Sequence, residues 1–241
     1  MANPDWTRDE LILALDLYFR EPKAQGSGIH PGCIELSAAL NALPIHPLGT
    51  REATFRNPNG VGMKLINFRK YDPTFKGKGL PAGSHLEEEV WNSFALDLPR
   101  LKEVSTAIRN GISELAGSSE SIAELVGQDE ETEEGKLLLA LHKRRERDAS
   151  FAKKKKDQTM KSAGALVCEV CSFDFKKVFG GHGLGFAECH HDRPISKMAP
   201  GEKTKLSELR IVCANCHRML HRGKQWPTLD ELRSMIETQG A

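Results

Sequence analysis

Four of the six cysteines in this chain of 241 residues form two pairs with the spacing of zinc ligands, Cys168-x-x-Cys171 and Cys213-x-x-Cys216. Two such pairs can supply four thiolates to one tetrahedral zinc ion, and a site closed by four protein ligands has no open position for chemistry. In a reducing compartment the two pairs favour zinc over a framework of disulfides. We therefore predict a structural zinc ion, whose binding contributes directly to the folding of a small domain.

Four histidines close to these cysteines have the spacing of a second, separate site. His217 and His221 are four residues apart, so on a helix they project from one face. His190 and His191 are adjacent, so in an extended strand they point to opposite sides. One of that pair can then join His217 and His221 on a metal ion, while the other faces a substrate.

The elements that must position these residues follow from capping and hydrophobic spacing. Thr7-Arg-Asp-Glu10 and Ser84-His-Leu-Glu87 have the form of capping boxes, and apolar residues follow each at helical spacing. Strand signals are sparse in this part, so we predict a mostly helical N-terminal domain. In the C-terminal part, the aromatic segment 173–179 and the glycine-rich loop after it suggest a strand, a turn and a second strand.

A reversal in the sign of charge divides the chain. Residues 120–134 contain acidic but no basic residues, and a strongly basic stretch follows from Lys136. Such a reversal indicates a connector rather than a core. We predict a helical DNA-recognition domain over residues 1–117, a charged helical connector over 118–165 and a zinc-containing domain over 166–241, an α+β arrangement.

The composition is that of a soluble, folded protein, with 39% hydrophobic residues, 28% charged residues and a net charge of +1. No stretch approaches about 18 uninterrupted apolar residues, which argues against a membrane span. The first residues lack the basic flank and apolar run of a signal peptide. We expect a cytoplasmic protein without a membrane partner, in which Cys33 and Cys189 are buried and are not nucleophiles.

Basic residues between Arg51 and Lys78 alternate with aromatic ones, a combination that can neutralise phosphates and stack on bases. The alternative is a solvated basic face over core aromatic residues. The candidate DNA-binding residues of this stretch are Arg51, Arg56, Lys64, Arg69 and Lys70.

Residues 168–222 resemble an HNH nuclease domain of the zinc-containing ββα-metal type. Glu188-x-His190-His191-Asp-Arg-Pro-Ile-Ser followed by His217-x3-His221-Arg is similar to the nuclease domains of the DNase colicins. The frame of four cysteines resembles McrA-type, modification-dependent restriction endonucleases. Segments 6–11 and 57–68 look like N-terminal regions that accompany HNH domains in bacterial endonucleases.

The resemblance implies a role for each matching residue. His190, His217 and His221 would hold a catalytic divalent cation, and His191 would act as the general base. Ligation by imidazoles alone suits Zn²⁺, Ni²⁺, Co²⁺ or Mn²⁺ about as well as Mg²⁺. Glu188 would orient a neighbouring histidine or arginine.

Two further features concern the surroundings of that site. Arg193, Arg218 and Arg222 are candidates for phosphate contacts, with ordinary surface charge as the alternative. Glu208 stands where the family has the asparagine that fixes the loop between its two strands. The geometry of this loop is therefore in question more than the chemistry.

Together these features predict a metal-dependent DNA endonuclease, a hydrolase of phosphodiester bonds. The sharper hypothesis is a restriction enzyme of bacterial defence that cleaves modified, for example methylated, double-stranded DNA. A homing-like or type II HNH nuclease would carry the same C-terminal residues, and a zinc-stabilised DNA-binding protein would need only the cysteine frame. One HNH site cuts one strand, so double-strand cleavage would require a homodimer or two sequential nicks.

Overall fold

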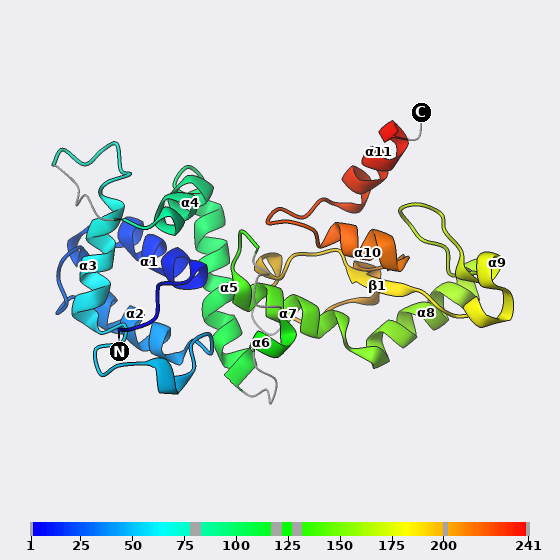
Figure 1. Cartoon of the computed structure of the whole chain (residues 1–241), viewed down its shortest axis with the longest axis horizontal. Helices are drawn as coiled ribbons and strands as arrows, with labels where there is room; N and C mark the ends of the chain where they lie inside the picture. The colour runs from blue at the N-terminus through cyan, green and yellow to red at the C-terminus, as the bar shows by residue number, and fades with distance from the viewer. Residues whose placement is uncertain (1, 78–82, 117–121, 127–131, 200–201, 240–241) are drawn as a thin grey trace. The chain divides into compact units, whose positions relative to one another are not determined.

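The structure is a computed structural model that describes residues 2–77, 83–116, 122–126, 132–199 and 202–239 (Figure 1). The chain divides into two compact units, Met1–Ala140 and Leu141–Ala241. This division falls inside the segment predicted as a connector. The predicted boundary between residues 117 and 118 lies outside the described residues.

The described part of the N-terminal unit is helical, as predicted. Helix α1 packs against the other four long helices of this unit. Both predicted capping boxes are present, Thr7 with Glu10 before α1 and Ser84 with Glu87 before α4. The elements are α1 (Arg8–Arg20), η1 (Pro22–Ala24), α2 (Pro31–Ala42), η2 (Leu48–Thr50), α3 (Pro58–Phe68), α4 (His85–Phe94), α5 (Leu98–Ala116) and α6 (Ile122–Leu125).

Helix α7 (Lys136–Glu146) crosses the division between the units. The carboxylate of Asp9 accepts hydrogen bonds from the backbone N–H groups of Lys136 (2.9 Å) and Leu137 (3.0 Å). These are donors that the first turn of a helix leaves unsatisfied, and a negative charge at this end is favourable. The buried Asp9 therefore fixes the start of α7.

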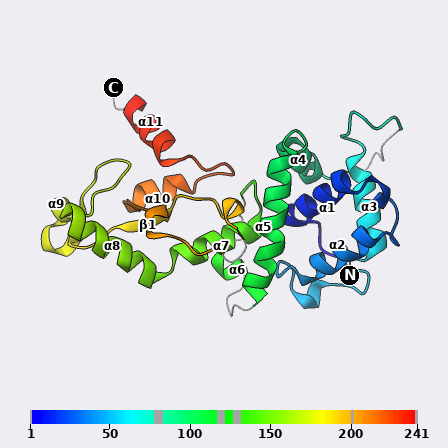
Figure 2. The same cartoon turned by 180° about the vertical axis from the view of Figure 1, so that it is seen from behind.

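The C-terminal unit is built around a two-stranded antiparallel sheet and a short helix. Strand β1 pairs with β2 so that Glu188 lies opposite Val212 and His191 lies opposite Leu209. Helices α8 and α10 contact β1, and both views show them beside it (Figure 1 and Figure 2). The elements are α8 (Ala149–Ala163), α9 (Phe175–Phe179), η3 (Gly180–Gly183), β1 (Glu188–His191), η4 (Ile195–Lys197), η5 (Leu206–Glu208), β2 (Leu209–Val212), α10 (Ala214–Leu220) and α11 (Leu229–Gln239).

Two small cores hold this unit together. One lies between the sheet and α8 and contains Cys189, Leu209 and Ile211, with Phe151 of α8 packed against it. The other contains three of the four paired cysteines, Cys168, Cys213 and Cys216, and includes Leu220, at the end of α10. Cys189 packs inward and Cys33 is buried on α2, as predicted. The predicted α+β arrangement with a ββα C-terminal domain is confirmed.

The prediction of a strand after the first cysteine pair is wrong. Residues Phe175–Phe179 form helix α9, and a 3-10 turn follows. The Asp174 side chain caps α9 by accepting hydrogen bonds from the backbone N–H groups of Lys176 (2.8 Å) and Lys177 (3.3 Å). Gly180 ends it with φ +59°, a conformation that favours glycine. A local cap thus overrode the strand preference of the aromatic residues.

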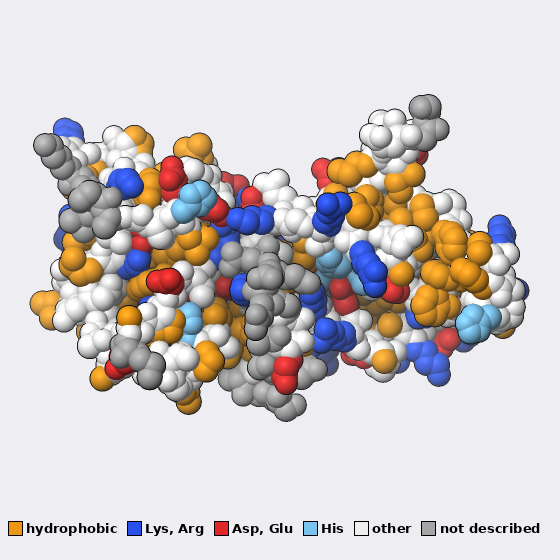
Figure 3. Space-filling view, in the orientation of Figure 1, with side chains coloured by type: hydrophobic (Ala, Val, Ile, Leu, Met, Phe, Trp, Pro, Cys, Tyr) orange, Lys and Arg blue, Asp and Glu red, His pale blue; other side chains and the backbone are white. Residues whose placement is uncertain are grey.

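Hydrophobic side chains remain partly exposed over α9 and the loop after it (Figure 3). The exposed members are Val178, Phe179, Leu184 and Phe186.

Within the described parts of the chain, no helix combines the length and the apolar character that crossing a membrane requires.

Candidate active site

The four paired cysteines meet at the start of α10. Cys213 is the N-cap of α10, and its Sγ lies 3.4 Å from the backbone nitrogen of Cys216. The Sγ atoms of Cys171 and Cys213 are 3.7 Å apart, and the four Sγ atoms lie within 4.8 Å of one another. Tetrahedral zinc with Zn–S bonds of about 2.3 Å requires sulfur atoms about 3.8 Å apart. This group is therefore consistent with structural zinc.

The thiols differ in how readily they ionise. Burial raises the pKa of the Cys168 thiol, but backbone hydrogen bonds of Cys171 and Cys213 outweigh it and lower that pKa. Burial raises the pKa of the Cys216 thiol, and the neighbouring Cys171 and Cys213 raise it further. Crowded thiols of this kind become thiolates when a cation supplies compensating charge.

The histidines from the two distant stretches converge at a second place. The Nε2 atom of His221 lies 3.2 Å from Nδ1 of His190 and 3.1 Å from Nε2 of His217. The ring centroids of His190 and His217 are 5.5 Å apart. His190 is on β1, His217 is on α10 and His221 is its C-cap, so the ββα arrangement brings the three predicted ligands together.

Helix α7 adds two residues that sequence reasoning missed, His142 and Glu146. The Glu146 Oε1 atom lies 3.1 Å from Nδ1 of His190, 3.1 Å from Nε2 of His217 and 3.2 Å from Nε2 of His221. Burial raises the pKa of Glu146, but hydrogen bonds with His142 and the other histidines outweigh it and hold the pKa well below its ordinary value.

Two histidine sets can be drawn around Glu146. His142 Nε2 lies 3.1 Å from Glu146 Oε1, and His142, Glu146, His190 and His221 have donor atoms within 4.8 Å of one another. We favour the set in which His217 replaces His142. The Nε2 atom of His217 lies 3.1 Å from Nε2 of His221 and 3.1 Å from Oε1 of Glu146. The Trp226 ring packs on the other side of this cluster, with its centroid 4.3 Å from His221 and 4.9 Å from His142.

Glu188 orients His217. Its Oε2 atom lies 2.6 Å from Nδ1 of His217, on the opposite side of the ring from the cluster. A carboxylate in this position fixes the proton on Nδ1 and leaves the Nε2 lone pair free for a metal ion. Burial opposes protonation of His217, but Glu146 and Glu188 together raise its pKa.

His191 lies beside the cluster rather than in it. Its backbone N–H donates to Glu146 Oε1 at 3.0 Å, while its imidazole is buried and neither ring nitrogen has a hydrogen-bond partner among the described residues. Burial lowers the pKa of His191, and the nearby His142 lowers it further. The ring is thus neutral at physiological pH, the form in which an imidazole can accept a proton.

Glu208 fixes the loop between the two strands in place of the expected asparagine. Its Oε2 accepts a hydrogen bond from the backbone of Lys205 at 2.8 Å, and its Oε1 accepts one from Arg193 at 3.3 Å. Glu208 Oε2 also lies 3.9 Å from Nε2 of His191. A carboxylate at this position therefore ties both ends of the loop together.

The candidate phosphate contacts of this unit differ in their surroundings. Arg218 and Arg222 are exposed, next to His217 and His221 in the sequence. Arg193 is engaged with Glu202 (2.7 Å) as well as with Glu208. Figure 3 shows Lys and Arg side chains on the same face of this unit as histidine side chains.

The N-terminal candidates are tied into their own unit to different degrees. Arg56 is buried and donates to both carboxylate oxygens of Glu10, at 2.7 and 2.9 Å, so we do not include it among the DNA contacts proposed below. Arg51 donates to the backbone oxygens of Asn41 (2.7 Å) and Leu43 (3.0 Å), at the end of α2.

Three other basic residues lie on or just after α3. Lys64 pairs with Glu87 at 2.5 Å, and Arg69 donates to Gln25 at 2.7 Å. The Lys70 ammonium lies 5.3 Å from the centroid of the Tyr71 ring. These residues share one segment but do not converge on one site.

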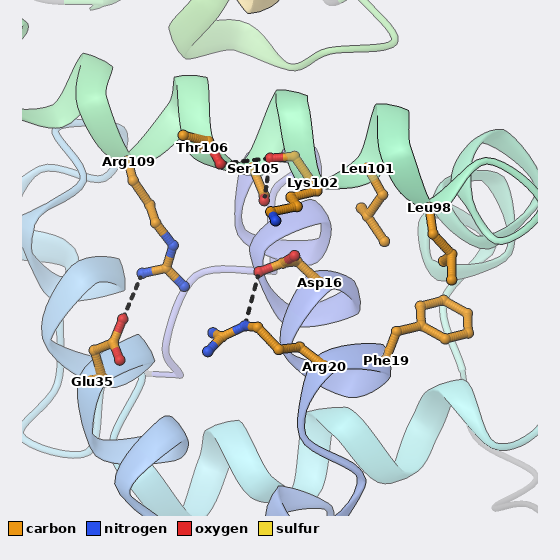
Figure 4. Close-up of a pocket in the computed structure, with 10 residues that line it drawn as sticks. All are labelled: Asp16, Phe19, Arg20, Glu35, Leu98, Leu101, Lys102, Ser105, Thr106 and Arg109. Atoms are coloured by element: carbon orange, nitrogen blue, oxygen red, sulfur yellow. Dashed lines mark hydrogen bonds and ion pairs between the residues drawn. The ribbon is translucent and has the colours of Figure 1, made fainter. Parts of the chain in front are cut away.

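The N-terminal unit also contains a pocket of about 430 Å³ between α1, α2 and α5. Four of its charged side chains are paired, Asp16 with Arg20 at 3.7 Å and Glu35 with Arg109 at 3.4 Å. Figure 4 shows Phe19, with two leucines, at the opposite end from Arg109 and Glu35. The pocket thus combines an apolar end with a charged end.

Comparison with known proteins agrees with the geometry. The model of the HNH endonuclease family matches residues 168–223, a segment that contains both cysteine pairs, both strands and α10. No curated protein and no solved structure matches the chain. The C-terminal unit therefore carries an HNH endonuclease domain, from a family of nucleases that act on DNA.

Proposed function

We propose that this protein is a metal-dependent DNA endonuclease that hydrolyses phosphodiester bonds. The observation that carries the proposal is the convergence of His190, His217 and His221. The Nδ1 atom of His190 and the Nε2 atom of His217 lie 3.2 and 3.1 Å from the Nε2 atom of His221. Nitrogen ligands about 2.0–2.1 Å from a tetrahedral ion lie about 3.3 Å apart, so the three imidazoles fit one cation. When bound, the cation neutralises charge on the scissile phosphate and stabilises the leaving oxygen.

His191 is the proposed general base. Its ring is neutral because burial lowers its pKa, so it can accept a proton from the attacking water. Two carboxylates fix the position of His191. Glu146 accepts a hydrogen bond from the backbone N–H of His191, and Glu208 holds the loop that follows His191 in the chain. Arg218 and Arg222 are the proposed phosphate contacts, because they are exposed beside the two ligands that come from the end of α10.

The proposed substrate is double-stranded DNA, and the sharper proposal is restriction of modified DNA. Its support is a separate helical unit with a pocket of about 430 Å³. This volume falls in the range of about 300–1,000 Å³ typical of small-ligand sites. Arg51, Lys64, Arg69 and Lys70 remain proposed contacts of this unit with the DNA backbone.

The test uses plasmids isolated from methylating and non-methylating hosts, incubated with the full chain and Mn²⁺ or Mg²⁺. Cleavage of the methylated plasmid alone supports modification dependence. Equal cleavage of both supports a homing-like or type II nuclease instead. Cleavage of neither with any divalent cation refutes the proposed activity, and gel filtration with and without DNA tests the homodimer that double-strand cleavage would require.

A further inference from the structure

Glu146 has the position of a metal ligand, not that of a residue that orients one. Besides His142, whose Nε2 lies 3.1 Å from Glu146 Oε1, four donor atoms meet here: Glu146 Oε1, His190 Nδ1, and the Nε2 atoms of His217 and His221. Four atoms have six mutual distances, and the five that have been given are all 3.1 or 3.2 Å. Separations near 3.3 Å are those of neighbouring ligands on an ion with bonds of about 2.0–2.1 Å, so these five distances suit a shared ion.

Protons alone do not satisfy every contact in this arrangement. Glu188 contacts the Nδ1 atom of His217, so a proton on Nε2 of His217 can be shared with Glu146 or with His221 but not with both. A hydrogen atom bridges one pair of atoms, whereas five close contacts must be satisfied at once. One cation at the centre uses all four lone pairs together.

The burial of Glu146 also indicates that it contacts a cation. The Glu146 side chain is 9% exposed, and buried carboxylates are normally paired with a cation or bound to a metal. Glu188 does what an orienting carboxylate does, because it contacts the far nitrogen of a histidine. Glu146 instead contacts the nitrogens that face the centre of the site.

We propose that Glu146 is the fourth protein ligand of the catalytic cation at rest, and that a phosphate oxygen of the substrate replaces it. This inference rests on the proposed function. A site closed by four protein ligands has no open position, whereas catalysis requires one. Glu146 is the ligand suited to leave, because it ends α7 and lies outside the matched segment 168–223, which supplies the three histidines.

Zinc affinity tests the ligand role. The full chain, with its cysteine site loaded, is titrated with Zn²⁺ by calorimetry and compared with Glu146→Ala and Glu146→Gln. We expect both to bind the second zinc at least about 100-fold more weakly, beyond the loss of about 10–100-fold typical of removing an orienting group. Asp157→Ala, on the exposed face of α8, is the matched control and should bind as the wild type does. Thermal melts select the variant that remains folded.

Phosphate binding tests the replacement step. If Glu146 occupies the position in about nine-tenths of the molecules, its removal strengthens the binding of inorganic phosphate to the zinc-loaded protein about tenfold. Zinc affinity within about threefold of the wild type overturns the ligand role, since that change is under 1 kcal/mol. Equal phosphate affinity in the loaded wild type and variant overturns the replacement. His190→Ala separates failure of this inference from failure of the proposed function. His190 belongs to both possible ligand sets, so second-site zinc binding that survives its loss refutes the proposed function itself.

Discussion

Replacing Cys216 by serine should destroy the nuclease site although Cys216 is not one of its ligands. The cysteine site lies at the start of α10, and His217 and His221 follow on the next turn of the same chain segment. Helix α10 has seven residues, fewer than the roughly 12–15 that an isolated helix needs even to be marginally stable. Its stability must therefore come from the zinc and from the small core around the thiols.

The expected magnitude follows from these contacts. Structural zinc contributes about 10–16 kcal/mol of apparent binding free energy in small zinc domains. A whole domain is stable by about 5–15 kcal/mol, so the loss of this site removes most or all of the stability of the C-terminal unit. We expect Cys216→Ser to contain one zinc fewer, to lose the cooperative melt of this unit in circular dichroism and to lose DNA cleavage.

The matched control is Cys33→Ser, in the other unit. The Cys33 thiol donates a hydrogen bond to the backbone oxygen of Ala24 at 3.3 Å, which a serine hydroxyl can keep. This variant should melt and cleave like the wild type. If Cys216→Ser lost one zinc but still melted cooperatively and cleaved at the normal rate, the dependence of α10 on the thiolate site would be refuted.

Three further changes test other parts of the molecule. His191→Ala should lower the cleavage rate about 10²–10⁴-fold with unchanged DNA affinity by fluorescence anisotropy, and a normal rate would contradict the general-base role. Glu188→Gln should weaken zinc binding at the histidine site about 10–100-fold in a calorimetric titration, whereas an unchanged affinity would exclude its orienting role. Glu10→Gln should lower the free energy of unfolding of the N-terminal unit by about 3–5 kcal/mol in urea titrations, because Arg56 loses its buried partner. Burial raises the pKa of Glu10, but hydrogen bonds with His46 and Arg56 outweigh it and lower the pKa from 4.5. The stabilisation by this ion pair is therefore complete above about pH 4.5 and is lost as the pH falls through the lowered pKa. A free energy of unfolding that does not change with pH in this acid range would refute the role of the ion pair.

The sequence predicted the features that depend on local patterns. The capping boxes at Thr7 and Ser84 place a hydroxyl and a carboxylate three residues apart, and that spacing alone satisfies the backbone donors of a helix start. The cysteine pairs are equally local, because Cys213 and Cys216 need only one helical turn to present both thiols together. A pattern of this kind is visible without knowledge of the tertiary fold.

Glu146 shows why the rest of the site escaped prediction. It lies 44 residues before His190 and 75 before His221, and nothing in its surroundings indicates that it is buried. The basic residues after His142 make the segment look like a solvated helix, and they hide the spacing His142-x3-Glu146, which matches that of His217-x3-His221. That i, i+4 spacing is the signal that could have found the pair.

Arg56 illustrates the opposite error, in which a charge in a basic segment suggests a surface. Its guanidinium is buried because it donates hydrogen bonds to the buried carboxylate of Glu10. Glu10 thus both caps α1 and pairs with Arg56. The capping box was predicted from residues 7–10, but the ion pair joins positions 46 residues apart. Composition cannot distinguish a cation that faces solvent from one that neutralises a buried carboxylate.

The spacing along α10 explains how one short helix can serve two metal sites. Each residue of an α-helix advances by about 100°, so Cys216 and His217, which are adjacent within α10, project in directions about 100° apart. This step places the thiolate and the imidazole on neighbouring but separate faces of the helix. Because α10 is too short to be stable alone, the orientation of its histidines depends on the thiolates that begin it. The scaffold and the catalytic site therefore cannot vary independently, and any change that alters the start of α10 also alters the geometry at His217 and His221.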